Sequence, residues 1–80
     1  MKREEIFERL NGVFQDVFDD KSITVNEKTT ADDIEKWDSL EHINLILAVE
    51  TEFGMKFTIG ETTTMDNVGE MVDIIIRNID

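Results

Sequence analysis

Apolar residues recur at helical spacing in three segments of this chain, whereas no segment alternates polar and apolar residues as a half-buried strand does. The first segment runs from Arg3 to about Phe18, and the second runs from Asp38 or Ser39 to Phe53. The third lies near the C-terminal end. The chain has no proline, so helix ends are predicted from glycine and capping residues. This pattern predicts an all-α bundle of three main helices in one domain, residues 1–80.

Each outer helix is predicted to bury a wide apolar face. The first helix carries Ile6, Leu10, Val13 and Val17 on one stripe, with Phe7, Phe14 and Phe18 beside it. The last helix carries Val68, Met71, Val72, Ile75 and Ile79 on one stripe. Stripes of this kind are typical of helices that pack around a shared core.

Capping residues mark the ends of the second and last helices. Asp38 can accept a hydrogen bond from a free helix amide, and Glu41 follows three residues later, as in a capping box. Gly54 is placed to end the second helix. Asn67 and Glu70 repeat the capping-box spacing, so the last helix is predicted to begin there.

Two connectors separate the helices. A long polar loop spans residues 19–38, and its apolar residues are predicted to anchor it to the helices. These anchors are Ile23, Val25, Ile34 and Trp37. Residues 55–66 contain Gly60 and three consecutive threonines, so we expect a connector with at most a short helical turn.

The charge balance narrows the possible partners. Nineteen Asp and Glu residues against eight Lys and Arg residues give a formal net charge of −11. That charge repels nucleic acid and anionic membrane surfaces, and it favours protein partners with basic patches. There is no cysteine, which excludes disulfides and thiolate chemistry. No segment resembles a signal peptide or is long enough to span a bilayer, so we expect a cytoplasmic monomer.

The second helix has more apolar residues than one buried stripe requires. At about 100° per residue, one group falls within an arc of about 100° and a second group within a separate arc of about 60°. The first group is Leu45, Ile46, Val49 and Phe53, and the second is Leu40, Ile43 and Leu47. The second stripe either packs under the long loop or forms a docking surface edged by Asn44, Glu50 and Thr51.

Ser39 lies where the second helix is predicted to begin. Unpaired amides and the positive end of the helix dipole favour a phosphate at such a position. Serine is also common in the first turn of helices, so position alone does not assign it a function.

The stretch Trp37-Asp38-Ser39-Leu40 is similar to the Asp-Ser-Leu attachment motif of acyl carrier proteins. Nearly the whole chain follows the pattern of that family. The likeness includes a first amphipathic helix, a long loop, an acidic end at residues 50–54 and a final helix opening at residues 67–70. The resemblance implies an acyl-carrier-like bundle, with three main helices, one short helical turn and a long loop between the first two helices.

The resemblance also implies a function. A phosphopantetheinyl transferase would attach 4′-phosphopantetheine to Ser39, and Asp38 would help to present the serine and metal-bound coenzyme A. The arm would hold acyl groups as thioesters for enzymes of fatty acid, polyketide or related biosynthesis. Acyl-loading and acyl-transferring enzymes with basic patches would contact Leu40, Glu41, Ile43, Asn44, Leu47 and Glu50. A short apolar cavity between the second and last helices would shelter the acyl chain.

Two features depart from the family pattern and leave the cargo open. Asn44 stands where many fatty-acid carriers have an acidic residue, and residues 60–64 are rich in threonine. Trp37 before the motif is more similar to specialised carriers than to the general fatty-acid type.

Three other functions are compatible with parts of the sequence. A serine hydrolase built on Ser39, His42 and Asp38 is disfavoured, since neighbouring residues of one helix do not supply a base, its orienting group and an oxyanion hole. A calcium sensor is disfavoured because no stretch has the spacing of an EF-hand loop. An unmodified helical protein-interaction domain would use the same exposed stripe without using Ser39.

Overall fold

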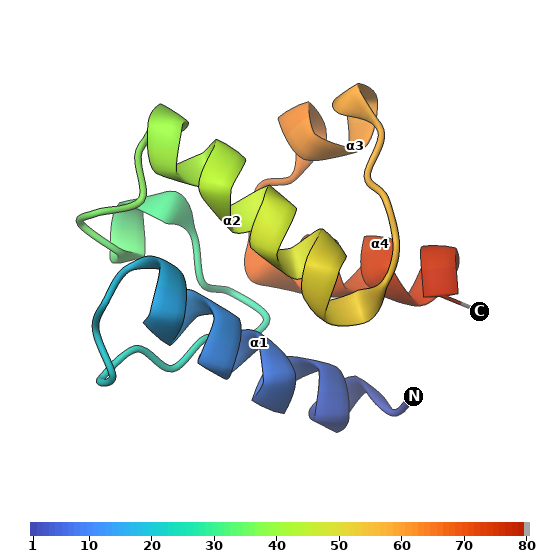
Figure 1. The fold of residues 1–80 in the computed structure, drawn as a ribbon, viewed down its shortest axis with the longest axis horizontal. Helices are drawn as coiled ribbons and strands as arrows, with labels where there is room; N and C mark the ends of the chain where they lie inside the picture. Colours follow the sequence, from blue (N-terminus) through green and yellow to red (C-terminus); the bar gives the residue numbers. More distant parts are fainter. Residues whose placement is uncertain (80) are drawn as a thin grey trace.

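The computed structural model describes residues 1–79, and Figure 1 shows their arrangement. The helices are α1 (Arg3–Val17), α2 (Ser39–Phe53), α3 (Ile59–Thr64) and α4 (Val68–Ile79). A short 3₁₀ helix, η1 (Ala31–Asp33), interrupts the long loop between α1 and α2. No strand occurs within residues 1–79, so the predicted all-α class is confirmed. None of the helices in this described part is long and apolar enough to cross a membrane.

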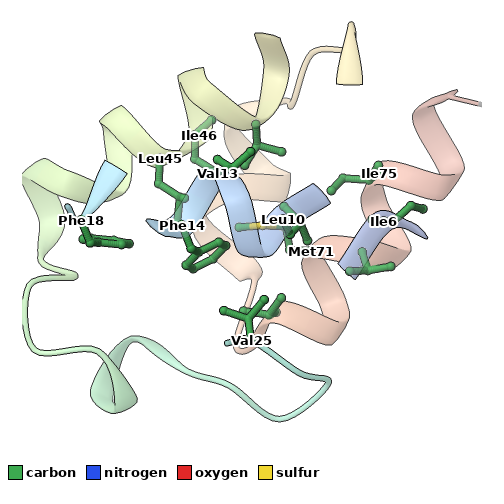
Figure 2. Close-up of a cluster of buried hydrophobic side chains, with 13 residues drawn as sticks. Ile6, Leu10, Val13, Phe14, Phe18, Val25, Leu45, Ile46, Met71 and Ile75 are labelled. Atoms are coloured by element: carbon green, nitrogen blue, oxygen red, sulfur yellow. The ribbon is translucent and has the colours of Figure 1, made fainter. Parts of the chain in front are cut away.

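One hydrophobic core joins the three long helices. α1 packs against both α2 and α4, and the first turn of α1 lies on the same side of the bundle as the last turn of α4 (Figure 1). Side chains from all three helices meet around Leu10 and Phe14 of α1 (Figure 2). The buried cluster is Ile6, Leu10, Val13, Phe14, Phe18, Val25, Leu45, Ile46, Val49, Val68, Met71, Val72 and Ile75. The predicted core stripes of the helices are therefore confirmed.

The long loop is anchored as its sequence predicts. Val25 is buried in the core, and Ile23, Ile34 and Trp37 pack against it. Polar contacts fix the loop as well: Asn11 Oδ1 accepts the Val25 amide at 2.7 Å, and the Val68 amide donates to the Thr29 carbonyl at 2.8 Å. The start of α4 is thus tied directly to the loop.

The cap of α2 is half of the predicted capping box. Asp38 Oδ1 accepts the Glu41 amide at 2.8 Å. The Glu41 carboxylate does not return to the Asp38 amide, which donates instead to the Lys36 carbonyl at 3.0 Å. Glu41 Oε1 accepts from Asn44 Nδ2 at 2.9 Å. Gly54 ends the helix in the left-handed conformation with φ of 62°, as predicted.

The cap of α4 is shifted by one residue from the predicted box. Asn67 Oδ1 accepts the Glu70 amide at 2.8 Å, which confirms Asn67 as the capping side chain. Glu70 Oε1 accepts the Asp66 amide at 3.0 Å instead of returning to Asn67.

α3 is longer than the single turn expected from its sequence. A full capping box begins it, because Thr58 Oγ1 accepts the Glu61 amide at 3.1 Å and Glu61 Oε1 accepts the Thr58 amide at 2.8 Å. The threonine hydroxyls turn back onto carbonyls of the preceding turn, as for Thr64 Oγ1 on Gly60 O at 2.8 Å. α3 contributes no buried residue to the core.

Candidate functional site

Ser39 is the first residue of α2, and it is exposed. Its position follows from the cap, since Asp38 holds an extended backbone conformation and turns the chain into the helix. The amides of the first helical turn have no intrahelical acceptor, so those at Ser39 and Leu40 add positive potential beside the hydroxyl. The site therefore combines an accessible hydroxyl with a local preference for anions.

A hollow of about 460 Å³ opens beside Ser39. It lies between the start of α2, the end of α3 and the start of α4. Met71 at 1% exposure and the half-buried Trp37 and Met65 form its apolar part, whereas Asp38 and Asp66 are exposed. The hollow matches the place predicted for an apolar cavity, with α3 as an additional wall.

His42 is held by two hydrogen bonds that the sequence did not reveal. Trp37 Nε1 donates to His42 Nδ1 at 3.0 Å, which fixes the proton of the neutral ring on Nε2. Nε2 then donates to the Thr62 carbonyl of α3 at 3.3 Å. Trp37 itself packs edge-on against Phe14, with ring centroids 5.3 Å apart. His42 therefore has the partly exposed structural position expected for it, and it links α2 to α3.

The outer stripe of α2 faces solvent. Leu40, Ile43 and Leu47 are 69%, 59% and 54% exposed, so the stripe does not pack under the long loop. Ile59 at the start of α3 is 84% exposed. A second hollow of about 270 Å³ between α2 and α3 continues this apolar surface. An apolar patch of this kind, with polar residues at its edge, is typical of a transient protein interface.

The polar residues predicted at the edge of this stripe differ in how far they are exposed. Asn44 is exposed and Glu41 is half-buried, and the two are joined by a hydrogen bond. Glu50 lines the hollow between α2 and α3 beside Leu47, but its side chain is only 11% exposed. Its carboxylate accepts the Phe57 amide at 2.8 Å and lies 3.8 Å from Lys56 Nζ. Glu50 thus holds the segment after α2, and its contact with partner enzymes stays a prediction.

The two disfavoured chemistries find no support in the geometry. Both His42 nitrogens are engaged by Trp37 and Thr62, so neither is free to accept the Ser39 proton. Among residues 1–79, no group of three or more histidine, cysteine or acidic side chains is placed to hold a metal ion.

The fold and the site define a small helical domain with an exposed serine at the start of α2 and an exposed apolar face on the same helix. No protein-family model matches the sequence. The chain is 33% identical to the acyl carrier protein of Coprothermobacter proteolyticus, over 99% of its own length and 96% of that protein. It also matches the solution NMR structure of holo acyl carrier protein from Geobacter metallireducens with a TM-score of 0.86 and 40% identity, over 91% of this chain and 84% of that one. The chain belongs to the acyl carrier protein family, whose members carry acyl groups and do not catalyse reactions.

Proposed function

We propose that Ser39 carries 4′-phosphopantetheine through a phosphodiester on its hydroxyl, and that the chain delivers acyl groups to biosynthetic enzymes. The observation that supports this most is the position of Ser39 at the mouth of an apolar hollow, on the first turn of α2. When bound, the arm supplies a flexible tether ending in a thiol that holds the cargo as a thioester.

The residues around Ser39 fit such a group. The hydroxyl is exposed, so a transferase can reach it, and the first-turn amides favour the negative phosphodiester. Asp38 is exposed beside it, where it both caps α2 and offers a carboxylate to the metal-bound coenzyme A of the transferase. The hollow beside Ser39 gives the acyl chain a place away from water.

The outer face of α2 is the proposed docking surface for the transferase and for acyl-loading and acyl-transferring enzymes. Leu40, Ile43 and Leu47 supply its apolar contacts, and Glu41 and Asn44 supply polar contacts at its edge. The net charge of −11 attracts partners with basic patches and speeds their association. The same charge disfavours nucleic acid and anionic membranes. We place this carrier in the cytoplasm as a monomer, serving fatty acid, polyketide or related specialised biosynthesis.

The test is the intact mass of the purified apo chain after incubation with coenzyme A, magnesium and a broad-specificity phosphopantetheinyl transferase. The parent should gain the mass of one phosphopantetheine, and the Ser39→Ala variant should gain nothing. Ser22 is the other serine of the chain, so Ser22→Ala is the matched control and should be modified like the parent.

The competing proposal is an unmodified interaction domain that uses the α2 face without an arm. It predicts no mass gain with several transferases on a chain shown to be folded. It also predicts that Ser39→Ala leaves partner binding unchanged.

A further inference from the structure

His42 stands between two hollows. The hollow of about 460 Å³ beside Ser39 and the hollow of about 270 Å³ between α2 and α3 have different linings, but His42 and Thr62 belong to both. The first hollow reaches down to Met71, whereas the second is lined on its inner side by Ile46 and Phe57. The pair formed by His42 and Thr62 is therefore the boundary that separates the two spaces.

The position of the His42 ring is fixed from both sides. Trp37 donates to Nδ1 at 3.0 Å, and Nε2 donates to the Thr62 carbonyl at 3.3 Å. The indole and imidazole planes are also nearly parallel, at 16° with centroids 6.0 Å apart. Trp37 is itself held in place by Phe14 and Phe18. A ring with both nitrogens bonded has little freedom to rotate out of the boundary.

The other wall at this point is α3, and it is attached mainly by polar contacts. α3 buries none of its own residues, so it is not fixed by the core. The hydrogen bond between His42 and the Thr62 carbonyl holds α3 to α2. Arg77 Nη2 donates to Glu61 at 3.0 Å, and this bond holds α3 to α4. Removing the His42 ring would thus take away both the partition and one of these attachments.

We propose that His42 sets the length of acyl chain that this carrier shelters. The inference rests on the proposed function, since it assigns the hollow beside Ser39 to the cargo. With the ring in place, a chain entering beside Ser39 is confined to the first hollow, because the imidazole closes the side toward the second hollow. Without the ring, the first hollow joins the apolar space between α2 and α3, and a longer chain is buried. His42 is a specificity-determining residue, because it lines the hollow and touches no reacting atom.

The test does not depend on modification of Ser39 by a transferase. Because the chain has no cysteine, Ser39→Cys introduces a single thiol at the mouth of the hollow. Alkyl methanethiosulfonates from ethyl to decyl attach a chain there as a mixed disulfide and release methanesulfinate. Thermal unfolding then reports burial, because each methylene that is fully buried should raise Tm by about 3–6 °C in a domain of this size.

Tm of the Ser39→Cys protein should rise with chain length and then level off once the first hollow is full. In the Ser39→Cys protein that also carries His42→Ala, the rise should continue to longer chains. His42→Leu is the control for loss of the hydrogen bonds, because a leucine fills the same space and should keep the levelling length of the parent. Gly12→Cys is the control for the thiol, since a side chain there meets nothing within 4 Å, and Tm should not rise with length.

The proposal is overturned if His42→Ala levels off at the same chain length as the parent. It is also overturned if His42→Leu lengthens the series as much as His42→Ala, because loosening of α3 and not the size of the side chain would then be the cause. A flat series in every background would show that the hollow beside Ser39 does not bury alkyl chains at all. None of these results bears on whether Ser39 carries an arm, which the mass measurement decides.

Discussion

Gly69 of α4 lies directly against the backbone of Glu27 in the long loop. Its amide donates to the Glu27 carbonyl at 3.1 Å, and a Cβ atom at this position would lie 2.6 Å from the same oxygen. Only glycine fits this contact, which ties the long loop to the first turn of α4. Arg3 strengthens the junction, since its Nη2 atom bonds both Glu27 Oε1 at 2.6 Å and the Gly69 carbonyl at 3.2 Å.

Gly69→Ala should destabilise the protein. Alanine favours a helix over glycine by about 1 kcal/mol, but the overlap with a backbone carbonyl costs more than that. We expect a net loss of about 1–2 kcal/mol in the free energy of unfolding, measured by denaturant titration. Gly12→Ala in α1 is the matched control and should stabilise by about 0.5–1 kcal/mol, because nothing lies within 4 Å of its new side chain. Equal effects at the two glycines would contradict the contact.

Arg3→Met should lower Tm, and the loss should shrink as salt is added. Arg3 forms a forked pair with Glu27, at 2.6 Å for both bonds, and its third nitrogen lies 2.8 Å from Asp73 Oδ1. These partners are exposed, so mobile ions screen them. Lys21→Met removes the same charge from an exposed loop position and serves as the control. A loss for Arg3→Met that does not change with salt would point to packing instead of charge.

The same substitution at two leucines of α2 should affect stability very differently. Leu45 is fully buried, so Leu45→Ala should cost about 2–5 kcal/mol of stability. Leu47 is 54% exposed, so Leu47→Ala should change stability by less than about 0.5 kcal/mol. Leu47→Ala should nevertheless slow modification of Ser39 by the transferase, measured as the initial rate of mass gain. An unchanged rate for Leu47→Ala would remove this residue from the proposed docking surface.

The attachment of α3 should weaken in acid. The Thr58 amide and the Arg77 guanidinium hold the pKa of Glu61 below its ordinary value. A lowered pKa in the folded state means that the stabilisation is complete above the ordinary glutamate pKa of about 4.3 and is lost as pH falls through the lowered pKa. Arg77→Met should raise the pKa of Glu61, measured by NMR of its carboxyl carbon.

The Thr58 hydrogen bond remains in that variant, so the pKa of Glu61 should stay below its ordinary value. Arg9→Met is the control, because Arg9 pairs with Glu52 at 2.7 Å and its loss changes the net charge by the same amount. A pKa of Glu61 that moves equally in both variants would show a general charge effect and no specific bond.

Periodicity and capping residues were enough to predict the three long helices, their core stripes and the anchored loop. Local rules succeed there because each helix of this bundle carries its own apolar face and its own end signal. They did not predict the burial of the Glu50 carboxylate, because its place on the helical wheel suggests an exposed rim residue. Its carboxylate turns inward because the chain after Gly54 folds back and offers the Phe57 amide, a contact that no pattern along α2 encodes.

The position of Ser39 on the first turn of α2 was also predictable, because helix start and motif both belong to one segment. The sequence showed an outer stripe on α2 but left open whether it packs under the loop or faces solvent. The partition at His42 was not predictable. It needs Trp37, His42 and Thr62 to meet from a loop and two helices, and the threonine side chain plays no part, since the bond is to its carbonyl. A tryptophan five residues before a histidine was the one signal present in the sequence, and it leaves the third partner undetermined.

In this small protein, α3 and the hydrophobic core have separate roles. The core is built by α1, α2, α4 and the anchored loop, and α3 adds nothing to it. Substitutions in α3 therefore leave the core intact, and those at Thr62 and Thr63 alter a wall of the hollow beside Ser39. Changes at these two positions would reshape the proposed cargo hollow and leave Leu40, Ile43 and Leu47 on the outer face of α2 untouched.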